Sequence, residues 1–394
     1  MYMSFEYYAP TRVVFGVDAE LQTAQLIRRA GGTRVLIVCG GGSAVRSGLL
    51  GRIEASLKEQ ELPFTLLGGV VPNPHLDKVY EGIALGKQIQ ADFILAVGGG
   101  SVIDTAKAIA YGCADDCDVW ELFTHRAQAE RCLPVGVVLT IAAAGSEMSS
   151  GCVITNEKTG EKRAYDDDLC RPAFAVMDPA LTLTLPEYQT SSGIADILMH
   201  MMERYFNQSE NMAVTDAVSE ALTRTVMRYA RVLMHDPQDL KARAEIMWAG
   251  SLAHNGLTGC ATGGGDWACH NMEHELGGMF DVAHGAGLAA LWGSWARTVC
   301  RAAPERFVSF ARNVLGTAPG ETQAQTMENG IRAMEDFYRE IHMPTNLREL
   351  GVAPTDAQIE QMADSCLRAC GGTVGCVVPL GREDVIGIYK RARA

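Results

Sequence analysis

The tetrapeptide Gly-Gly-Gly-Ser occurs twice in the first part of the chain, at 40–43 and at 98–101. Each copy follows an apolar run that favours a β-strand, RVLIV at 34–38 and FILAV at 93–97, and each leads into a segment of helical periodicity. Alternating strands and helices of this kind build a parallel sheet with helices on both faces. The first half of the chain therefore predicts an α/β domain, and no other feature constrains the fold as strongly.

The pattern changes in the second half of the chain. After an expected strand at 133–140, residues 151–165 have β-rich ends around a Lys-Thr-Gly turn and predict a hairpin at the edge of the α/β domain. From about Pro186 onward, strand signals disappear and long helical periodicity takes over. We expect an α/β domain at 1–186 and an all-helical domain at 187–394.

Composition excludes several classes of partner. The formal net charge is −13, whereas nucleic-acid backbones and anionic membranes are bound by clustered Lys and Arg, so we expect neither as a partner. The sequence has no apolar run of about 18 residues and no leader pattern at its start, which predicts a cytoplasmic protein. The 12 cysteines include no C-x-x-C pair, so we expect reduced thiols, with Cys113/Cys117 and Cys366/Cys370 as packing residues.

Both glycine-rich turns stand where a phosphate can bind. Glycines allow close approach of the backbone, and the free N–H groups of the following helix favour negative charge. Neither turn spells the G-x-G-x-x-G fingerprint, and a tight turn without a ligand explains each one equally well. Asp104 and Lys107 continue the second turn into its helix, where capping or a solvated face also accounts for them.

Charged and imidazole side chains recur at helical spacing in the second half. Asp196 and His200 lie four residues apart among apolar neighbours and share one helix face. Downstream, three of the nine histidines fall within fifteen residues, His270, His274 and His284. One Asp with two or three His suits Fe(II), Zn(II), Mn(II) or Co(II), and spacing alone does not choose between His270 and His274.

Taken together, these residues resemble the iron-containing alcohol dehydrogenase family over nearly the whole chain. The motifs DWACHNMEHEL (266–276) and DVAHGAGLA (281–289) resemble its butanol dehydrogenase and NADPH-dependent aldehyde reductase branch most. The other matching stretches are Pro72-Asn73-Pro74, GGGSVIDTAK (98–107), Thr140, Gly145-Ser146-Glu147, Lys162, Asp178-Pro179 and Gly193-x-x-Asp196-x-x-x-His200.

The resemblance implies a fold and an activity. The expected fold is a Rossmann-like dinucleotide-binding domain followed by an all-α metal-binding domain, the architecture of dehydroquinate synthase. The expected activity is a metal-dependent alcohol dehydrogenase or aldehyde reductase that transfers a hydride between a nicotinamide dinucleotide and a small alcohol/aldehyde pair. A homodimer is also implied by the resemblance alone.

The resemblance also assigns roles to residues. It makes Asp196, His200, His270 and His284 the ligands of Fe(2+), which zinc can replace after aerobic purification, and it leaves His274 beside the nicotinamide as the candidate proton relay. The cofactor residues that it implies are Gly99, Gly100 and Ser101 for the pyrophosphate, Asn73, Thr140 and Lys162 for the groove, and Asp104 in support of the turn. The chain departs from the family pattern at Ala144, where a second Thr is usual, so one cofactor hydrogen bond is absent.

The first glycine turn predicts the choice of cofactor. An NAD-selective site usually has an acid at the end of the relevant strand, where it binds the ribose 2′-OH and repels a 2′-phosphate. Here Gly40, Gly41, Gly42 and Ser43 follow the strand, and no acid occurs until Glu54. The glycine N–H groups, the Ser43 hydroxyl and Arg46 can instead bind the phosphate, so we expect NADP(H) to be preferred over NAD(H).

Three other functions compete with this reading. A lyase resembling dehydroquinate synthase needs Arg and Lys for its polyanionic substrate, but 197–202 and 267–280 contain none. A polyol dehydrogenase resembling glycerol dehydrogenase lacks the His four residues after the metal-binding Asp. A non-catalytic binding protein would have lost a member of the ligand set, and all four are present.

Overall fold

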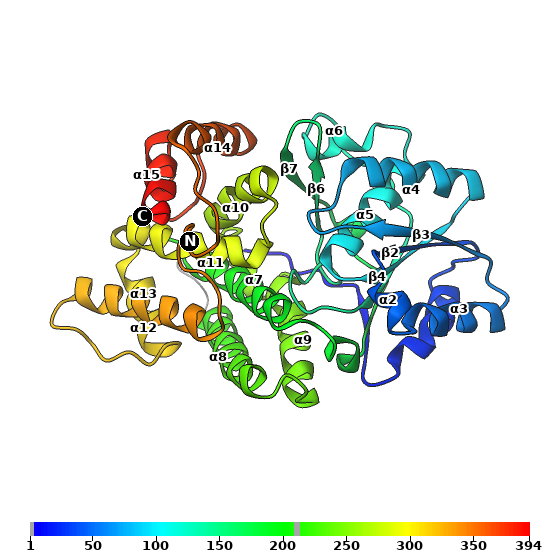
Figure 1. The fold of residues 1–394 in the computed structure, drawn as a ribbon, viewed down its shortest axis with the longest axis horizontal. Helices are drawn as coiled ribbons and strands as arrows, with labels where there is room; N and C mark the ends of the chain where they lie inside the picture. The colour runs from blue at the N-terminus through cyan, green and yellow to red at the C-terminus, as the bar shows by residue number, and fades with distance from the viewer. Residues whose placement is uncertain (1–3, 209–212) are drawn as a thin grey trace. The chain divides into compact units, whose positions relative to one another are not determined.

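The computed structural model describes residues 4–208 and 213–394, and the chain divides into two compact units. One unit spans Ala9–Leu185, and the other spans Pro186–Ala394 together with the N-terminal residues up to Tyr8 (Figure 1). The N-terminal segment therefore groups with the helical unit and not with the α/β domain that follows it in sequence. None of the described helices combines the length and the hydropathy that a membrane span requires.

A six-stranded sheet forms the centre of the α/β unit, and every pair of neighbouring strands is parallel. The predicted parallel sheet is confirmed. In spatial order the strands are β1 (Arg12–Phe15), β8 (Phe174–Met177), β5 (Val135–Leu139), β4 (Phe93–Gly98), β2 (Val35–Gly40) and β3 (Phe64–Val70). The sequence did not indicate β1 and β8, which have only four residues each.

Helices cover both faces of this sheet because its strands are apolar at consecutive positions. Val35 and Ile37 of β2 belong to one core with α1 (Thr23–Arg29) and α3 (Leu49–Glu59). Leu36, between them in sequence, points to the other face and lies 3.6 Å from the position of a Cβ on Gly86 of α4 (Leu76–Ile89). The α5 helix (Gly100–Ala114) packs beside α4. Burial on both faces explains the unbroken apolar runs of the strands.

The order of the strands creates a switch point at the carboxyl ends of β2 and β4. From β2 the chain continues to β3 on one side, and from β3 it returns to β4 on the other side of β2. In open α/β sheets, ligands bind at the carboxyl ends of the strands where the connections diverge in this way. Both Gly-Gly-Gly-Ser turns lie there, one before α2 (Ser43–Arg46) and one at the start of α5.

The predicted hairpin is confirmed as an antiparallel pair, β6 (Gly151–Asn156) and β7 (Glu161–Asp166). Its β6 strand is tied to the loop before α4, since the Thr155 N–H donates to the Pro74 carbonyl at 2.8 Å. The short α6 (Val119–Phe123) packs against β7.

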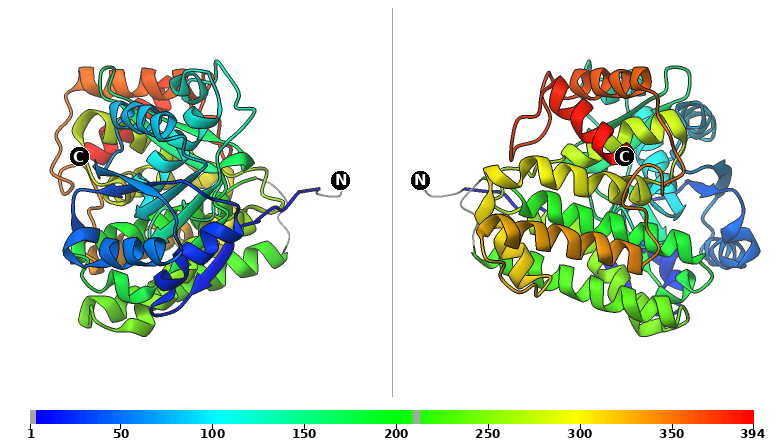
Figure 2. Two further views of the ribbon diagram at one scale, coloured as in Figure 1. Left: turned by 90° about the vertical axis from the view of Figure 1, so that its right-hand side faces the viewer. Right: turned by 60° about the vertical axis from the view of Figure 1, so that its left-hand side comes forward.

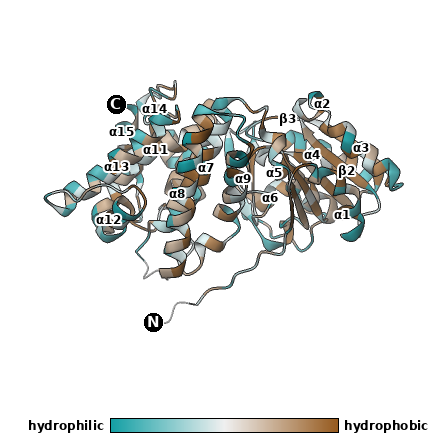
Figure 3. Ribbon diagram, turned by 90° about the horizontal axis from the view of Figure 1, so that it is seen from below, coloured by the Kyte–Doolittle hydropathy of each residue, from teal (hydrophilic) through white to brown (hydrophobic). Residues whose placement is uncertain are grey.

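The second unit is helical, and its described residues contain no strand, only an isolated bridge between Val374 and Leu380. The central helix α7 is buried on nearly all sides from Thr190 onward because α8, α9 and α11 pack against it (Figure 2). Figure 3 shows hydrophobic and hydrophilic residues alternating along the helices of this unit. The helices are α7 (Glu187–Tyr205), α8 (Ala213–His235), α9 (Leu240–His254), α10 (Ala268–Phe280), α11 (His284–Val299), α12 (Pro304–Asn313), α13 (Gln323–Glu340), α14 (Asp356–Ala369) and α15 (Arg382–Arg393).

Candidate active site

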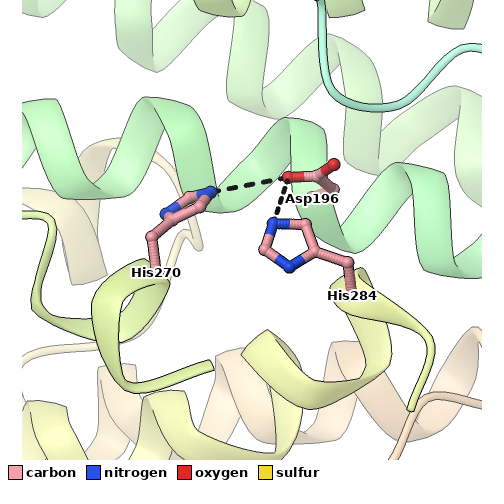
Figure 4. Close-up of side chains that lie close together, drawn as sticks. All are labelled: Asp196, His270 and His284. Atoms are coloured by element: carbon pink, nitrogen blue, oxygen red, sulfur yellow. Dashed lines mark ion pairs between the residues drawn. The ribbon is translucent and has the colours of Figure 1, made fainter. Parts of the chain in front are cut away.

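Three helices bring one carboxylate and three imidazoles together. Asp196 and His200 lie one turn apart on α7, His270 lies in the first turn of α10, and His284 begins α11. The Asp196 Oδ1 atom is 3.6 Å from His270 Nε2 and 3.8 Å from His284 Nε2 (Figure 4). The same atom is 3.5 Å from His200 Nδ1. The start of α11 can approach α7 because residue 285 is a glycine. A Cβ at this position would lie only 1.9 Å from the Ser192 carbonyl oxygen.

The ligand atoms of this cluster fit a metal ion. Asp196 Oδ1, His200 Nδ1 and His270 Nε2 are buried, and none has a hydrogen-bond partner. Buried polar atoms that stay unpaired cost roughly 1–3 kcal/mol each. The ligand atoms of Asp196, His270 and His284 all lie within 4.8 Å of one another, close enough for one cation to bind them and remove that cost. His200 lies outside this group, although its Nδ1 is near Asp196. Imidazole nitrogen with carboxylate oxygen is a donor set for first-row divalent ions. The residues present therefore fit an iron-type site.

Two further carboxylates support the imidazoles from behind. Glu203 on α7 hydrogen-bonds to His270 Nδ1, and Glu273 on α10 hydrogen-bonds to His284 Nδ1. Both carboxylates are fully buried. A carboxylate on the far nitrogen of a metal-binding His fixes its tautomer and ring orientation.

Sequence reasoning missed both supporting residues, although a signal for one of them is present. Glu203 lies seven residues after Asp196 and three after His200, on the same face of an otherwise apolar helix. Its carboxylate also accepts a hydrogen bond from the Cys269 N–H at 2.6 Å, at the start of α10. Glu203 thus joins α7 to α10 at the cluster.

Burial and charge act on the imidazoles in opposite directions. Burial lowers the pKa of His200 well below its usual value, and the neighbouring His254 and His270 lower it further. Burial alone lowers the pKa of His270 as well, but the negative charges of Glu203 and Asp196 and the hydrogen bond between His270 Nδ1 and Glu203 outweigh it and raise the pKa to about 9.

His274 stands apart from the Asp196 set. It lies one turn after His270 on α10 and is buried, and its ring stacks on that of His284 with the centroids 5.9 Å apart. Its ligand atom groups with those of Glu273 and His284, whereas those of His270 and His284 group with Asp196. The structure thus separates His270 from His274, which the spacing did not.

The second glycine turn owes its sequence to close packing. A Cβ on Gly98 would lie 2.5 Å from Val102 Cγ2, and one on Gly99 would lie 2.0 Å from Ile141 Cγ2. A Cβ on Gly100, next to Ser101, would lie 3.2 Å from that of Ala144, so the loop that departs from the family pattern lies against this turn.

The other expected groove residues lie on loops of the same unit. Thr140 follows β5, and its N–H donates to the Gly98 carbonyl at 3.1 Å. Asn73 follows β3 in a left-handed conformation, with φ of 50°. The hairpin pairs Lys162 with Thr155, which is bonded to Pro74, so Lys162 and the Asn73 loop are connected through the hairpin.

Asp104 and Lys107 fasten α5 to the loop after β5 and to the hairpin. Asp104 accepts hydrogen bonds from Ser146 Oγ at 2.6 Å and from the Val153 N–H at 3.0 Å. Lys107 is fully buried, and its ammonium donates to the carbonyls of Ser149 at 2.9 Å and Gly151 at 2.8 Å. A solvated face for Lys107 is therefore wrong, because its charge is held by buried carbonyls.

A parallel sheet with glycine turns at its switch point and a helical unit with an Asp-His cluster define a metal-dependent nicotinamide oxidoreductase. Comparison with known proteins gives the family. The family described as iron-containing alcohol dehydrogenase matches residues 10–179, and its C-terminal region, described as Fe-containing alcohol dehydrogenase family, C-terminal, matches 190–393. The chain belongs to the iron-containing alcohol dehydrogenase family.

Individual relatives match along the whole chain. NADH-dependent butanol dehydrogenase A of Clostridium acetobutylicum is 39% identical, over 99% of this chain and 100% of the relative. NADPH-dependent aldehyde reductase YqhD of Escherichia coli is 32% identical, again over 99% and 100%. The crystal structure of NADH-dependent butanol dehydrogenase A from Thermotoga maritima superposes with a TM-score of 0.95 at 35% identity, over 99% of both chains.

These findings confirm the predicted family, branch and fold class. The protein is an NAD(P)-dependent alcohol dehydrogenase of the iron-containing type. Family membership favours this oxidoreductase over the lyase considered from the sequence. The relatives named above include both NADH- and NADPH-dependent enzymes, so family membership alone does not decide the choice of cofactor.

Proposed function

We propose that the protein interconverts small aldehydes and alcohols with NADP(H), at a divalent iron held by Asp196, His200, His270 and His284. The observation that carries this proposal is the convergence of the ligand atoms of Asp196, His270 and His284 within 4.8 Å of one another, with those of Asp196 and His270 buried and unpaired. When bound, the ion supplies Lewis acidity at the substrate oxygen, and the nicotinamide supplies or removes a hydride.

The protein side chains orient the site and move the proton. Glu203 and Glu273 hold the Nδ1 protons of His270 and His284, so that both Nε2 atoms point toward Asp196. The apolar, fully buried neighbours Ile197, Leu198 and Met199 keep water from the carboxylate side of the cluster. His274 is our candidate for the proton relay, with one ring nitrogen exchanging the proton of the alcohol, because it lies beside His284 outside the Asp196 set.

The α/β unit is proposed to bind the dinucleotide, and the helical unit to bind the metal. Gly99, Gly100 and Ser101 begin a fifteen-residue helix, whose free N–H groups suit the pyrophosphate. Asn73, Thr140 and Lys162 complete the groove, and Asp104 supports it through Ser146.

The preference for NADP(H) rests on the end of β2. No acid stands between Gly40 and Arg46, and the Arg46 guanidinium folds back until Nη1 is 3.0 Å from the position of a Cβ on Gly42. A cation therefore lies over the turn where an NAD-selective site places a carboxylate. Charge-assisted hydrogen bonds to a 2′-phosphate are worth about 1.5–3 kcal/mol.

The proposal is tested by reconstitution of the apo-protein. Anaerobic Fe(II) is expected to restore aldehyde reduction with NADPH, and Zn(II) is expected to restore less. Equal or better turnover with zinc contradicts iron as the native metal, and turnover without any metal contradicts the whole site. Two further expectations are a homodimer, from the family resemblance, and a reducing compartment such as the cytoplasm, from the free cysteines.

A further inference from the structure

Trp267, directly before α10, has a backbone conformation that bulky residues rarely adopt. Its φ is 61° and its ψ is 10°, in the left-handed region, and it follows glycines 263–265, whose φ values are also positive. A bulky residue in this region is strained, and such strain persists only where the surroundings impose it, often at functional sites. The position of the indole ring must therefore be held by specific contacts.

The indole ring and the backbone of Trp267 are both held by specific contacts. The indole Nε1 donates to the Gly264 carbonyl at 2.6 Å, and the Arg204 guanidinium carbon lies 4.5 Å from the ring centroid. A Cβ on Gly265 would be 3.1 Å from Nε1, so that glycine leaves room for the indole. The Trp267 carbonyl accepts from Asn271 Nδ2 at 2.8 Å. Side chain and backbone are both fixed.

The fixed ring lies against two of the proposed metal ligands. Its centroid is 5.2 Å from that of His270 and 6.1 Å from that of His200, both in edge-to-face arrangement. Trp267 is half-buried, so the ring extends from the cluster to the surface of its unit. His274 stacks on His284 instead, and the two side chains thus flank different members of the cluster.

The donor groups of Arg204 are engaged by neighbouring groups. Its guanidinium donates to the carbonyls of His200 at 2.9 Å and Ala253 at 3.3 Å while its face covers the indole. The wall beside the imidazoles is consequently aromatic, which suits an uncharged hydrocarbon chain and not an anionic one.

We propose that Trp267 is a specificity-determining residue that limits the room for the carbon chain of the substrate beside the metal centre. This inference rests on the metal centre proposed above. An aldehyde whose oxygen is held at the cluster meets the indole with its chain, so short, unbranched aldehydes are favoured over long or branched ones. Pocket walls of this type discriminate by roughly 10- to 200-fold per methylene.

The test replaces the ring without disturbing the turn. Glycine adopts the left-handed conformation freely, so Trp267→Gly removes the indole and relieves the strain together. We expect the ratio of kcat/KM for octanal to that for propanal, with NADPH and per bound iron, to rise by about tenfold or more. The ratio for 2-methylpropanal to propanal is expected to rise as well. Trp248→Ala, on an exposed part of α9, is the matched control and leaves both ratios unchanged.

A second variant keeps the test decisive if Trp267→Gly binds iron poorly. Asn also tolerates the left-handed region, so Trp267→Asn is measured in the same way. Unchanged ratios in an iron-loaded variant overturn the proposal, and so does loss of iron from both variants, because the ring then serves only to hold the cluster. Absence of iron-dependent turnover in the unaltered enzyme contradicts the metal centre itself, which separates the two failures.

Discussion

The two proposed binding regions of this enzyme are built by opposite means. The metal cluster consists of side chains, and each imidazole is positioned by its helix and, for His270 and His284, by a buried carboxylate. The phosphate turns consist of backbone, and in the second turn the key positions have no side chain because neighbours fill the space, as Ile141 does at Gly99. The first region is defined by charge and burial, and the second by shape.

This difference determines how each region fails. Removal of a ligand takes away a metal donor and leaves a buried carboxylate without its partner, so iron binding is lost and the helices are destabilised through charge. Addition of a methyl group to a phosphate turn forces the loop and the strand apart, so structure and cofactor binding are lost together. The predictions below test this contrast, beginning with the largest effect.

Removal of a ligand imidazole is expected to have the largest effect. His270→Ala eliminates one donor and leaves Glu203 without its partner, so iron content falls and turnover drops by about 10³-fold or more, since metal polarisation is worth several kcal/mol. Metal analysis and kcat measured together check this outcome. The control is His235→Ala at the exposed end of α8. Full activity with unchanged iron in His270→Ala removes this residue from the ligand set.

Weakening of a supporting carboxylate is expected to have a smaller effect. Glu203→Gln keeps the shape of the side chain but removes the charge that orients His270, and changes of this type cost roughly 10- to 100-fold in metal affinity or activity. Competition with a chelator measures the iron affinity. Glu340→Gln, which breaks an exposed ion pair with Arg231, serves as the control and leaves the affinity unchanged. Equal affinities for the two variants would show that Glu203 is only a packing residue.

Two glycines, one from each turn, test the role of shape directly. Gly99→Ala places a methyl group 2.0 Å from Ile141, and overpacking of this kind costs about 1–3 kcal/mol in the free energy of unfolding. Gly41→Ala meets nothing within 4 Å and is expected to leave the stability unchanged. Thermal unfolding compares the two, and iron content should be normal in both. A stable Gly99→Ala enzyme with normal cofactor binding breaks the distinction between shape and charge.

The sequence predicted the fold where local patterns were long enough. Glycine turns after apolar runs indicated β2 and β4, whereas β1 and β8 have too few residues to show a pattern. Association of the N-terminal residues with the helical unit depends on long-range contacts, which no local pattern reports.

The candidate site was predictable from the sequence only where its residues lie close together on one helix. Spacing on one helix face paired Asp196 with His200, but it left His270 and His274 equivalent until α10 was placed beside α7. Glu203 and Glu273 escaped notice, and a solvated face was wrong for Lys107, because charged residues on helices usually face solvent and only the packed structure shows that these three are buried.

The smallest predicted effect concerns the choice of cofactor, where the shape of a turn and a single charge act together. NADPH is expected to exceed NADH in kcat/KM, and Arg46→Ala should reduce that ratio by about tenfold, the value of one exposed charge-assisted hydrogen bond. Gly40→Asp should reverse the ratio, because its carboxylate repels a 2′-phosphate and accepts from a 2′-hydroxyl. The substitution fits, since a Cβ on Gly40 would meet only the Val70 carbonyl at 3.4 Å and Val102 at 3.8 Å. Steady-state kinetics with both cofactors on the three enzymes decides the matter. Better use of NADH by the unaltered enzyme refutes the preference, and an unchanged ratio in both variants shows that this turn does not contact the adenosine ribose.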